Sequence, residues 1–149
     1  MMKAVVQRVD RASVSVDNSV IGETGTGLLV YLGVAKGDEK ADAQSLADKI
    51  MHLRIFEDSS RKMNHSLLDI SGDILVISQF TLLADCSKGR RPSFVGACEP
   101  VSATVLYEYF VELLQKKVRK VSTGRFQAMM KVESINNGPV TMILDTKKK

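Results

Sequence analysis

The chain has 149 residues, 44% of them hydrophobic and 26% charged, which is the composition of one globular domain. These values exclude a disordered chain, a collagen-like repeat and a disulfide-rich scaffold. The longest apolar stretch, residues 28–35, is far shorter than the roughly 20 residues of a membrane helix, and residues 3–8 lack the long apolar region of a signal peptide. We therefore expect a single domain over residues 1–149 that remains in the cytoplasm and has no membrane partner.

Strand patterns dominate the first third of the chain. Residues 3–9 and 12–16 are predicted strands, the second because its apolar and polar side chains alternate. A short returning strand is predicted from residues 20–22, after a polar turn. Residues 28–34 are apolar without a break, which is typical of a central strand covered on both faces.

Two helices are predicted from apolar residues that recur at helical spacing. The first covers residues 40–53, with Asp38 as its N-cap. The second has Ser102 as its N-cap. Its apolar face is made of Val105, Leu106, Tyr109, Phe110, Leu113 and Leu114.

Later strands are predicted at residues 74–80, from Phe126 to Val132 where the period returns to two, and at residues 140–144. In this alternation of even and odd positions, Met130 points inward and Met129 outward. The order of elements predicts an α/β single domain: a mixed, mostly antiparallel sheet or partial barrel with two flanking helices.

The positive charge, 21 basic against 17 acidic residues, is clustered along the chain. One cluster consists of Lys116, Lys117, Arg119 and Lys120, a second of Lys88, Arg90 and Arg91, and a basic tail of residues 147–149. Such clusters attract polyanions through counterion release, so an RNA partner is possible. From composition alone, a solvated helix end and a solubilising tail are the simpler interpretation.

The familiar catalytic patterns are missing. The sequence has no nucleophile-elbow, P-loop or zincin motif. Cys86 and Cys98 lack C-x-x-C spacing and are interpreted as reduced thiols, so no metal site is expected. His52 and His65 are interpreted as surface residues, which leaves no histidine for a triad. Any chemistry must therefore use backbone donors, hydroxyls and the substrate itself.

Two loops carry unusual polar residues. Residues 78–82 place hydrogen-bonding and aromatic groups at the end of a buried strand, where open sheets bind their ligands. Residues 136–141 contain Asn-Gly followed by Pro139, a combination in which a tight turn with a cis peptide can occur. From the residues alone, a strand end and a turn are the simpler interpretations of the two loops.

Together, Ser78-Gln79-Phe80-Thr81-Leu82 and Asn137-Gly138-Pro139-Val140-Thr141 resemble the motif pair of the D-aminoacyl-tRNA deacylase family. The resemblance extends over nearly the whole chain. Its further blocks are Ala4-Val5-Val6-Gln7-Arg8-Val9, Gly27-Leu28-Leu29-Val30, Leu32-Gly33-Val34, Lys49-Ile50, Leu53-Arg54-Ile55-Phe56, Lys62-Met63-Asn64 and Lys88-Gly89-Arg90-Arg91-Pro92-Ser93-Phe94.

This resemblance implies a homodimer that hydrolyses the ester between a D-amino acid, or glycine, and the terminal ribose of tRNA, without a metal or cofactor. It implies that the Gly138–Pro139 bond is cis and that this loop enters the partner's site, where it excludes L side chains. Met130 and Arg8 match positions that line or brace the pocket around the loop. The resemblance places the ester near Ser78, Gln79, Phe80 and Thr81.

Thr81 is a candidate nucleophile, but no base stands near it in the sequence, and an unactivated hydroxyl is a weak nucleophile. We favour a mechanism in which backbone N–H groups around Phe80 and Thr81 polarise the ester, while the 2′-hydroxyl of the terminal adenosine helps to activate water. The chain departs from the family pattern at Gln127 and Met129, where Gly and Asp are usual, and at Asn137, where Asp is usual.

Two other functions remain possible at this point. One is a non-catalytic nucleic-acid-binding relative with the same fold. The chain has no Trp, three Tyr and five Phe, which is a poor supply of stacking platforms for such a role. The other is a general esterase for small esters, which the absence of a histidine-centred triad disfavours.

Overall fold

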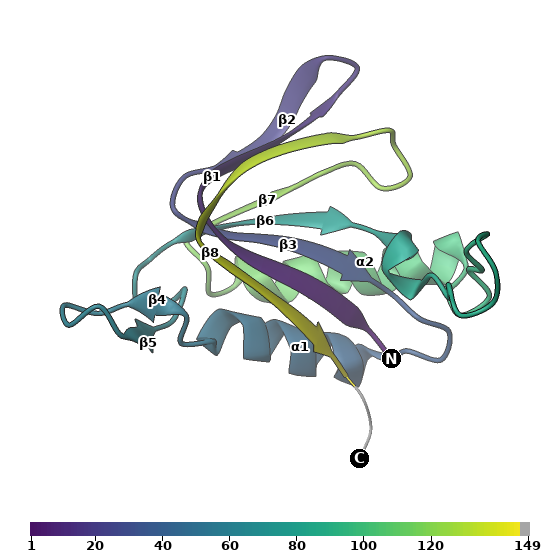
Figure 1. Cartoon of the computed structure of the whole chain (residues 1–149), viewed down its shortest axis with the longest axis horizontal. Coiled ribbons are helices and arrows are strands. Elements are labelled where there is room, and N and C mark those ends of the chain that lie inside the picture. The colour runs from purple at the N-terminus through teal and green to yellow at the C-terminus, as the bar shows by residue number, and fades with distance from the viewer. Residues whose placement is uncertain (147–149) are drawn as a thin grey trace.

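The structure is a computed structural model that describes residues 1–146, in which a curved sheet lies on two helices (Figure 1). The predicted tail of residues 147–149 lies outside the described residues. In chain order the elements are β1 Lys3–Val16, β2 Ser19–Thr24, β3 Gly27–Gly33, α1 Lys40–His52, β4 Phe56–Glu57, β5 Met63–His65, β6 Asp73–Ser78, the 3-10 helix η1 Phe80–Leu83, α2 Pro100–Gln115, β7 Lys120–Thr123 and β8 Lys131–Asp145.

The main sheet is mixed, as predicted. Its strands follow the order β2-β1-β3-β6-β7, and β8 pairs with β1. β1 is antiparallel to β2, β3 and β8, whereas β3, β6 and β7 run parallel to one another. The Ser122 hydroxyl on β7 donates to the Glu23 carbonyl on β2 at 2.9 Å, so the two ends of the strand order meet. The sheet is therefore a nearly closed barrel.

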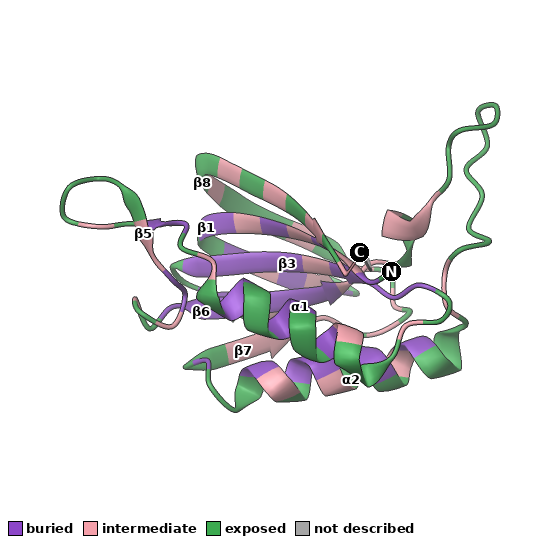
Figure 2. Cartoon of the chain, turned by 90° about the horizontal axis from the view of Figure 1, so that it is seen from below, coloured by how far each residue is buried: buried purple, intermediate pink, exposed green. Residues whose placement is uncertain are grey.

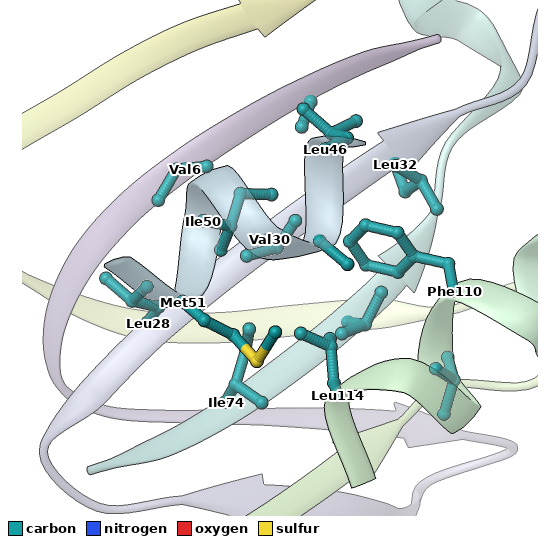
Figure 3. Packing of buried hydrophobic residues seen from close by; sticks show 14 of the residues in the cluster. Val6, Leu28, Val30, Leu32, Leu46, Ile50, Met51, Ile74, Phe110 and Leu114 are labelled. Carbon is teal, nitrogen blue, oxygen red and sulfur yellow. The ribbon is translucent and has the colours of Figure 1, made fainter. Parts of the chain in front are cut away.

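Both helices cover one face of the sheet. Ile50 of α1 and Phe110 of α2 pack against Val30 of β3 in the larger hydrophobic cluster (Figure 3). A smaller cluster, which includes Leu29, Leu75 and Ile77, fills the concave side. β3 and β6 are thus buried on both faces, as their unbroken apolar sequences predict. Figure 2 shows these strands as the most buried part of the molecule and β8 as the least buried long strand.

The predicted helix caps are wrong in both cases. Glu39 is the N-cap of α1, and its N–H donates to the Asp42 carboxylate at 2.8 Å. Asp38 instead accepts from the Ala35 N–H at 2.7 Å, which closes the preceding turn. α2 begins earlier than predicted, at Pro100, because proline suits the first position of a helix. Ser102 therefore lies inside this helix.

Three strand predictions also need correction. The first two predicted strands form the single strand β1, and β4, β5 and β7 have no counterpart among the predictions. Residues 126–130 are not a strand, because β8 begins only at Lys131. From there β8 continues through residues 136–141, so this segment is a bulge within a strand and not a turn between two strands.

None of the helices in residues 1–146 is long and apolar enough to cross a membrane. Within the same range, Cys86 and Cys98 are free thiols, in agreement with the sequence.

Candidate active site

The carboxyl ends of the parallel strands β3 and β6 carry the first predicted motif. The Gln79 N–H donates to the Leu32 carbonyl at 2.8 Å, which is the last link between this segment and β3. The chain then turns into η1. Gly33 permits this turn, because a Cβ there would lie 2.6 Å from Leu83 Cδ2 and 3.0 Å from the Gln79 carbonyl oxygen. The turn leaves Phe80 and Thr81 exposed to solvent.

The groups available at this strand end are backbone donors and neutral side chains. The Gln79 side-chain amide donates to the Thr81 hydroxyl. The N–H groups of Phe80 and Thr81 are the first two of η1 and therefore have no acceptor within the helix. Both histidines are remote: His52 lies at the end of α1 and His65 on β5, on the opposite side of the molecule (Figure 1). Thr81 therefore has no histidine base from its own chain.

Two further side chains lie at the same end. Met130 packs against the cluster that contains Ile77, the residue before Ser78. It points toward the inside of the sheet, while Met129 is 92% exposed, as predicted. Phe94 contacts Phe80 edge to face, with 5.1 Å between the ring centroids. Sequence reasoning did not predict this contact, although Phe94 is the last residue of one of the blocks that resemble the family. We call Ser78, Gln79, Phe80, Thr81 and Met130 the carboxyl-end half of the site.

The second predicted motif lies on a bulge of β8. Gln7 pairs with Thr141 and Val9 with Asn136, so residues 137–140 lie opposite the single residue Arg8. The Gly138–Pro139 peptide bond is cis, in agreement with the resemblance. We call Gly138, Pro139 and Arg8, the second part of the predicted site, the bulge half.

The Arg8 side chain fixes the bulge through hydrogen bonds. It is buried, and its Nη1 donates to the Ile55 carbonyl at 2.8 Å. Its Nε and Nη2 donate to the carbonyl and side-chain oxygens of Asn137, both at 3.3 Å. Gly138 has a φ of +115°, and a Cβ there would lie 2.7 Å from Arg8 Nη2. Glycine is therefore required both by its backbone conformation and by the close guanidinium.

Two asparagines replace the strand hydrogen bonds that the bulge removes. The Asn136 side-chain amide donates to the Arg8 carbonyl at 3.0 Å and to the Val140 carbonyl at 3.1 Å, so it bridges the base of the bulge. The Asn137 amide donates to the Asp10 carboxylate at 2.6 Å. Sequence reasoning placed both residues in a motif but did not predict these roles. At Asn137, the aspartate usual in the family would set two carboxylates against each other at this contact.

An open cleft of about 720 Å³ lies beside the bulge half and not at the carboxyl-end half. Arg8 and Asn137 form one side of it, and Asp73 and Arg119 another. Arg119 pairs with Asp73 at 3.1 Å, and the Asp73 carboxylate also accepts from the Gly25 N–H at 3.0 Å. Across residues 1–146, no three His, Cys, Asp or Glu side chains gather in a metal-binding arrangement.

Within a single chain, the two halves of the predicted site are far apart. Arg8 pairs with Leu28 at the start of β3, whereas Ser78 pairs with Leu32 near its end. At about 3.3 Å per residue, Leu28 and Leu32 are separated by about 13 Å along the strand. The structure therefore brings Met130 to the motif at residues 78–81 but places Arg8, Gly138 and Pro139 at the other end of the sheet.

Gln127, one of the departures from the family pattern, has a φ of +61°. A residue other than glycine, asparagine or aspartate in this conformation is strained by about 1–2 kcal/mol. We expect Gln127→Gly to raise the free energy of unfolding by about 1 kcal/mol in a denaturant titration, despite the greater backbone entropy of glycine. Gln115→Gly, at the end of α2, is the control and should be destabilising; a loss of stability in both variants contradicts the prediction.

Comparison with known proteins gives a consistent result. The family model described as D-Tyr-tRNA(Tyr) deacylase matches residues 5–145. D-aminoacyl-tRNA deacylases of Syntrophus aciditrophicus and Thermosipho melanesiensis are 53% and 56% identical to the chain, with 99% of each sequence covered in both comparisons.

Two solved structures agree with this fold. A structure described as c-Myc DNA Unwinding Element Binding Protein has a TM-score of 0.93 and 40% identity, over 98% of this chain and 99% of that one. Another, of a probable eukaryotic D-amino acid tRNA deacylase, has a TM-score of 0.83 over 97% and 98% of the two chains, and its 18% identity makes it a match of fold alone. Because the family model spans almost the whole sequence and relatives with more than half of their residues identical cover both chains end to end, this chain belongs to the D-Tyr-tRNA(Tyr) deacylase family.

Proposed function

We propose that the chain hydrolyses the ester that joins a D-amino acid, or glycine, to the 3′-terminal adenosine of tRNA. Family membership supports this activity, and the observation that carries its chemistry is the pair of N–H groups at Phe80 and Thr81, which have no helical acceptor and lie at an exposed strand end. Such donors suit the oxygen of an ester carbonyl, on which negative charge develops during attack. The substrate, aminoacylated tRNA, places the enzyme in the cytoplasm.

In this mechanism water attacks the ester carbonyl carbon while the two N–H groups hold its oxygen. The 2′-hydroxyl of the terminal adenosine orients the water, accepts its proton and passes its own proton to the neighbouring ribose 3′-oxygen. The bond between the carbonyl carbon and this 3′-oxygen breaks, so the leaving oxygen carries the proton and the 2′-hydroxyl is restored. The products are the free amino acid and tRNA. Thr81 and Gln79 position the substrate through their polar side chains, and no group of the chain forms a covalent intermediate.

A homodimer completes the site in this proposal. The bulge half is too far from the carboxyl-end half of its own chain, so it serves the site of a second copy. The surface of β8 supports such pairing, because Ile143 is 77% exposed and Ile135 is 43% exposed on this strand, which within residues 1–146 pairs with β1 alone. A two-fold dimer uses the same patch twice and creates two equal sites.

Selectivity then follows from the rigidity of the bulge. Arg8 and Asn136 fix the backbone around Gly138 and Pro139, and the carbonyl groups of these two residues occupy the space that an L side chain would need. A D side chain points away from them. An L-aminoacyl ester is excluded sterically, whereas a glycyl ester, which has no side chain, is accepted.

The test is hydrolysis of D-tyrosyl-tRNA and L-tyrosyl-tRNA, measured side by side with purified protein and repeated with a chelator. The expected result is rapid loss of the D-ester only, at the same rate in both conditions. Turnover that does not require the attached tRNA would indicate a general esterase instead. If a folded dimer hydrolyses neither ester, the proposal is wrong.

Thr81→Ala provides a direct test of the nucleophile. Because the mechanism uses the backbone N–H of this residue and not its hydroxyl, we expect the variant to keep substantial activity, within about 10-fold of the wild-type rate. Single-turnover hydrolysis of D-tyrosyl-tRNA measures this rate without the contribution of product release. Complete loss of hydrolysis in a correctly folded variant would return Thr81 to the role of nucleophile.

Nucleic-acid binding without catalysis is the second candidate, and one observation favours it. The solved structure with a TM-score of 0.93 is described as a DNA-unwinding-element-binding protein. A pure binder would retain tRNA with salt-dependent affinity and leave its ester intact. The two-ester experiment therefore separates the two candidates.

A further inference from the structure

The cluster of basic residues at the start of β7 lies at the same end of the molecule as the bulge half. Its four members are exposed, and we call them the amino-end cluster because they lie where the parallel strands begin: Lys116, Lys117, Arg119 and Lys120. Val118, which is buried, anchors the turn that carries them. Arg119 lines the same cleft as Arg8 and Asn137, so the cluster and the bulge are neighbours. Figure 1 shows the start of β7 and the bend of β8 at the left-hand end of the sheet.

Most of the charge of this cluster is not neutralised by the protein. The two arginines of the cleft have acidic partners, Arg119 with Asp73 at 3.1 Å and Arg8 with Glu57 at 3.9 Å. Lys116, Lys117 and Lys120 form no ion pair with any carboxylate of residues 1–146. The cleft itself is therefore close to neutral, and the excess positive charge lies on the surface beside it.

A second basic group, Lys88, Arg90 and Arg91, lies beyond η1, and we call it the loop cluster. It is carried by an excursion whose base is closed by mutual backbone hydrogen bonds between Asp85 and Ser93, at 2.7 and 2.9 Å. Hydrogen bonds from Ser87 to the Asp85 carboxylate lower the pKa of this carboxyl group and brace the first turn. The excursion is the long exposed loop at the upper right of Figure 2.

Within one chain, the two clusters lie at opposite ends of the sheet, as do the two halves of the site. In the proposed two-fold dimer the bulge half enters the partner's site, and the adjoining amino-end cluster accompanies it. Each site is then flanked by the loop cluster of one chain and the amino-end cluster of the other. In that dimer, basic side chains of two different chains lie on either side of the ester.

We propose that Lys116, Lys117 and Lys120 bind phosphates of the tRNA acceptor arm whose 3′ end occupies the partner subunit's site. This inference rests on the proposed deacylase function. An RNA acceptor arm carries closely spaced phosphates, and exposed lysines without acidic partners gain binding energy there through counterion release. Arg119 contributes less, because its guanidinium is paired with Asp73. The bulge half would thus be presented to the ester together with the surface that holds the RNA.

The first test removes two of the lysines with the double variant Lys117→Gln/Lys120→Gln. We expect KM for D-tyrosyl-tRNA to rise by about 10-fold or more at 0.1 M salt, and the slope of log KM against log salt to fall by about 1.4–1.8, or 0.7–0.9 for each lost phosphate contact. The effect falls on KM and not on kcat, because neither lysine touches the ester. The control is Lys40→Gln/Lys49→Gln on α1, which has the same change in net charge. Equal effects of the two double variants overturn the proposal.

The second test asks which subunit supplies the lysines. In mixed dimers with two affinity tags, one chain carries Phe80→Pro, which removes a proposed N–H donor, so that hydrolysis occurs only in the other site. If the lysines act across the dimer, removing them from the chain with intact Phe80 leaves KM at the wild-type value. Removing them from the Phe80→Pro chain raises KM by about 10-fold. The reverse pattern shows that the lysines act within their own subunit and overturns the proposal.

If mixed dimers do not assemble, photocrosslinking provides an alternative test. Lys117→p-benzoylphenylalanine should crosslink to acceptor-arm nucleotides of bound tRNA, and its failure to do so while the protein still binds tRNA contradicts the proposal. These results are separable from a failure of the proposed function. If the wild-type protein does not hydrolyse D-tyrosyl-tRNA, the function is wrong; if it does but its KM and salt slope do not depend on Lys117 and Lys120, only the inference is wrong.

Discussion

Phe80→Pro is expected to lower kcat for D-tyrosyl-tRNA by about 10²–10³-fold, the usual cost of removing one donor to a developing oxyanion. Proline removes the Phe80 N–H but suits this position, because Phe80 is the first residue of η1 and the preceding Gln79, with φ −143° and ψ 83°, lies outside the helical region that a following proline disfavours. Single-turnover hydrolysis measures the effect, and circular dichroism checks the fold.

The matched control is Phe80→Ala, which loses the ring and its contact with Phe94 but keeps the N–H. We expect this variant to retain kcat within about 10-fold, with most of its effect on KM, because an exposed aromatic ring offers a surface for a nucleotide base. Equal kcat losses in the proline and alanine variants would show that the ring matters and that the N–H does not. The oxyanion mechanism would then be wrong.

Arg8→Lys is expected to lower the ratio of D-ester to L-ester hydrolysis by about 10- to 100-fold. The lysine keeps the positive charge but cannot reproduce the fork that reaches both Asn137 oxygens, and hydrogen bonds to charged groups contribute about 1.5–3 kcal/mol each. A loosened bulge admits L side chains, so the ratio falls through faster L-ester hydrolysis. Rates on D-tyrosyl-tRNA and L-tyrosyl-tRNA, measured at equal concentration, give this ratio directly.

Arg11→Lys is the control, because Arg11 lies on the same strand but is exposed and forms a surface ion pair with Glu133 at 3.6 Å. It should leave the ratio unchanged. Thermal unfolding of both variants separates loss of selectivity from loss of stability. If Arg8→Lys lowers the melting temperature while the D/L ratio stays at its wild-type value, Arg8 supports the fold and does not position the bulge.

Much of the architecture could be predicted from hydrophobic patterns. The unbroken apolar runs that form β3 and β6 indicated buried central strands, and the helical spacing in α1 and α2 indicated their apolar faces. β7 escaped prediction because its sequence, Lys120–Thr123, has few apolar residues and follows a basic cluster. It is held by pairing with β6 rather than by its own pattern. Such tertiary pairing cannot be detected in a local window.

The candidate site was harder to predict than the fold. The resemblance indicated both motifs, but no local signal showed that they lie at opposite ends of one sheet, because that separation depends on the register between β1, β3 and β6. The bulge in β8 could not be predicted from the sequence either. An Asn-Gly-Pro segment predicts a turn, and only the pairing of Gln7 with Thr141 and of Val9 with Asn136 shows that the strand continues past it.

The bulge also restricts how the length of the chain can change. Both flanks of residues 137–140 are registered against the same strand, one through Asn136 and the other through Thr141. Because successive side chains of a strand point to opposite faces, a one-residue deletion or insertion that shifted the register of one flank would turn all its side chains to the wrong face. A length change taken up by the bulge would instead disturb the contacts of Arg8 and Asn136 that fix Gly138 and Pro139. Surface loops ordinarily tolerate insertions and deletions. Here either outcome has a cost, so substitutions are the main route by which this segment can vary.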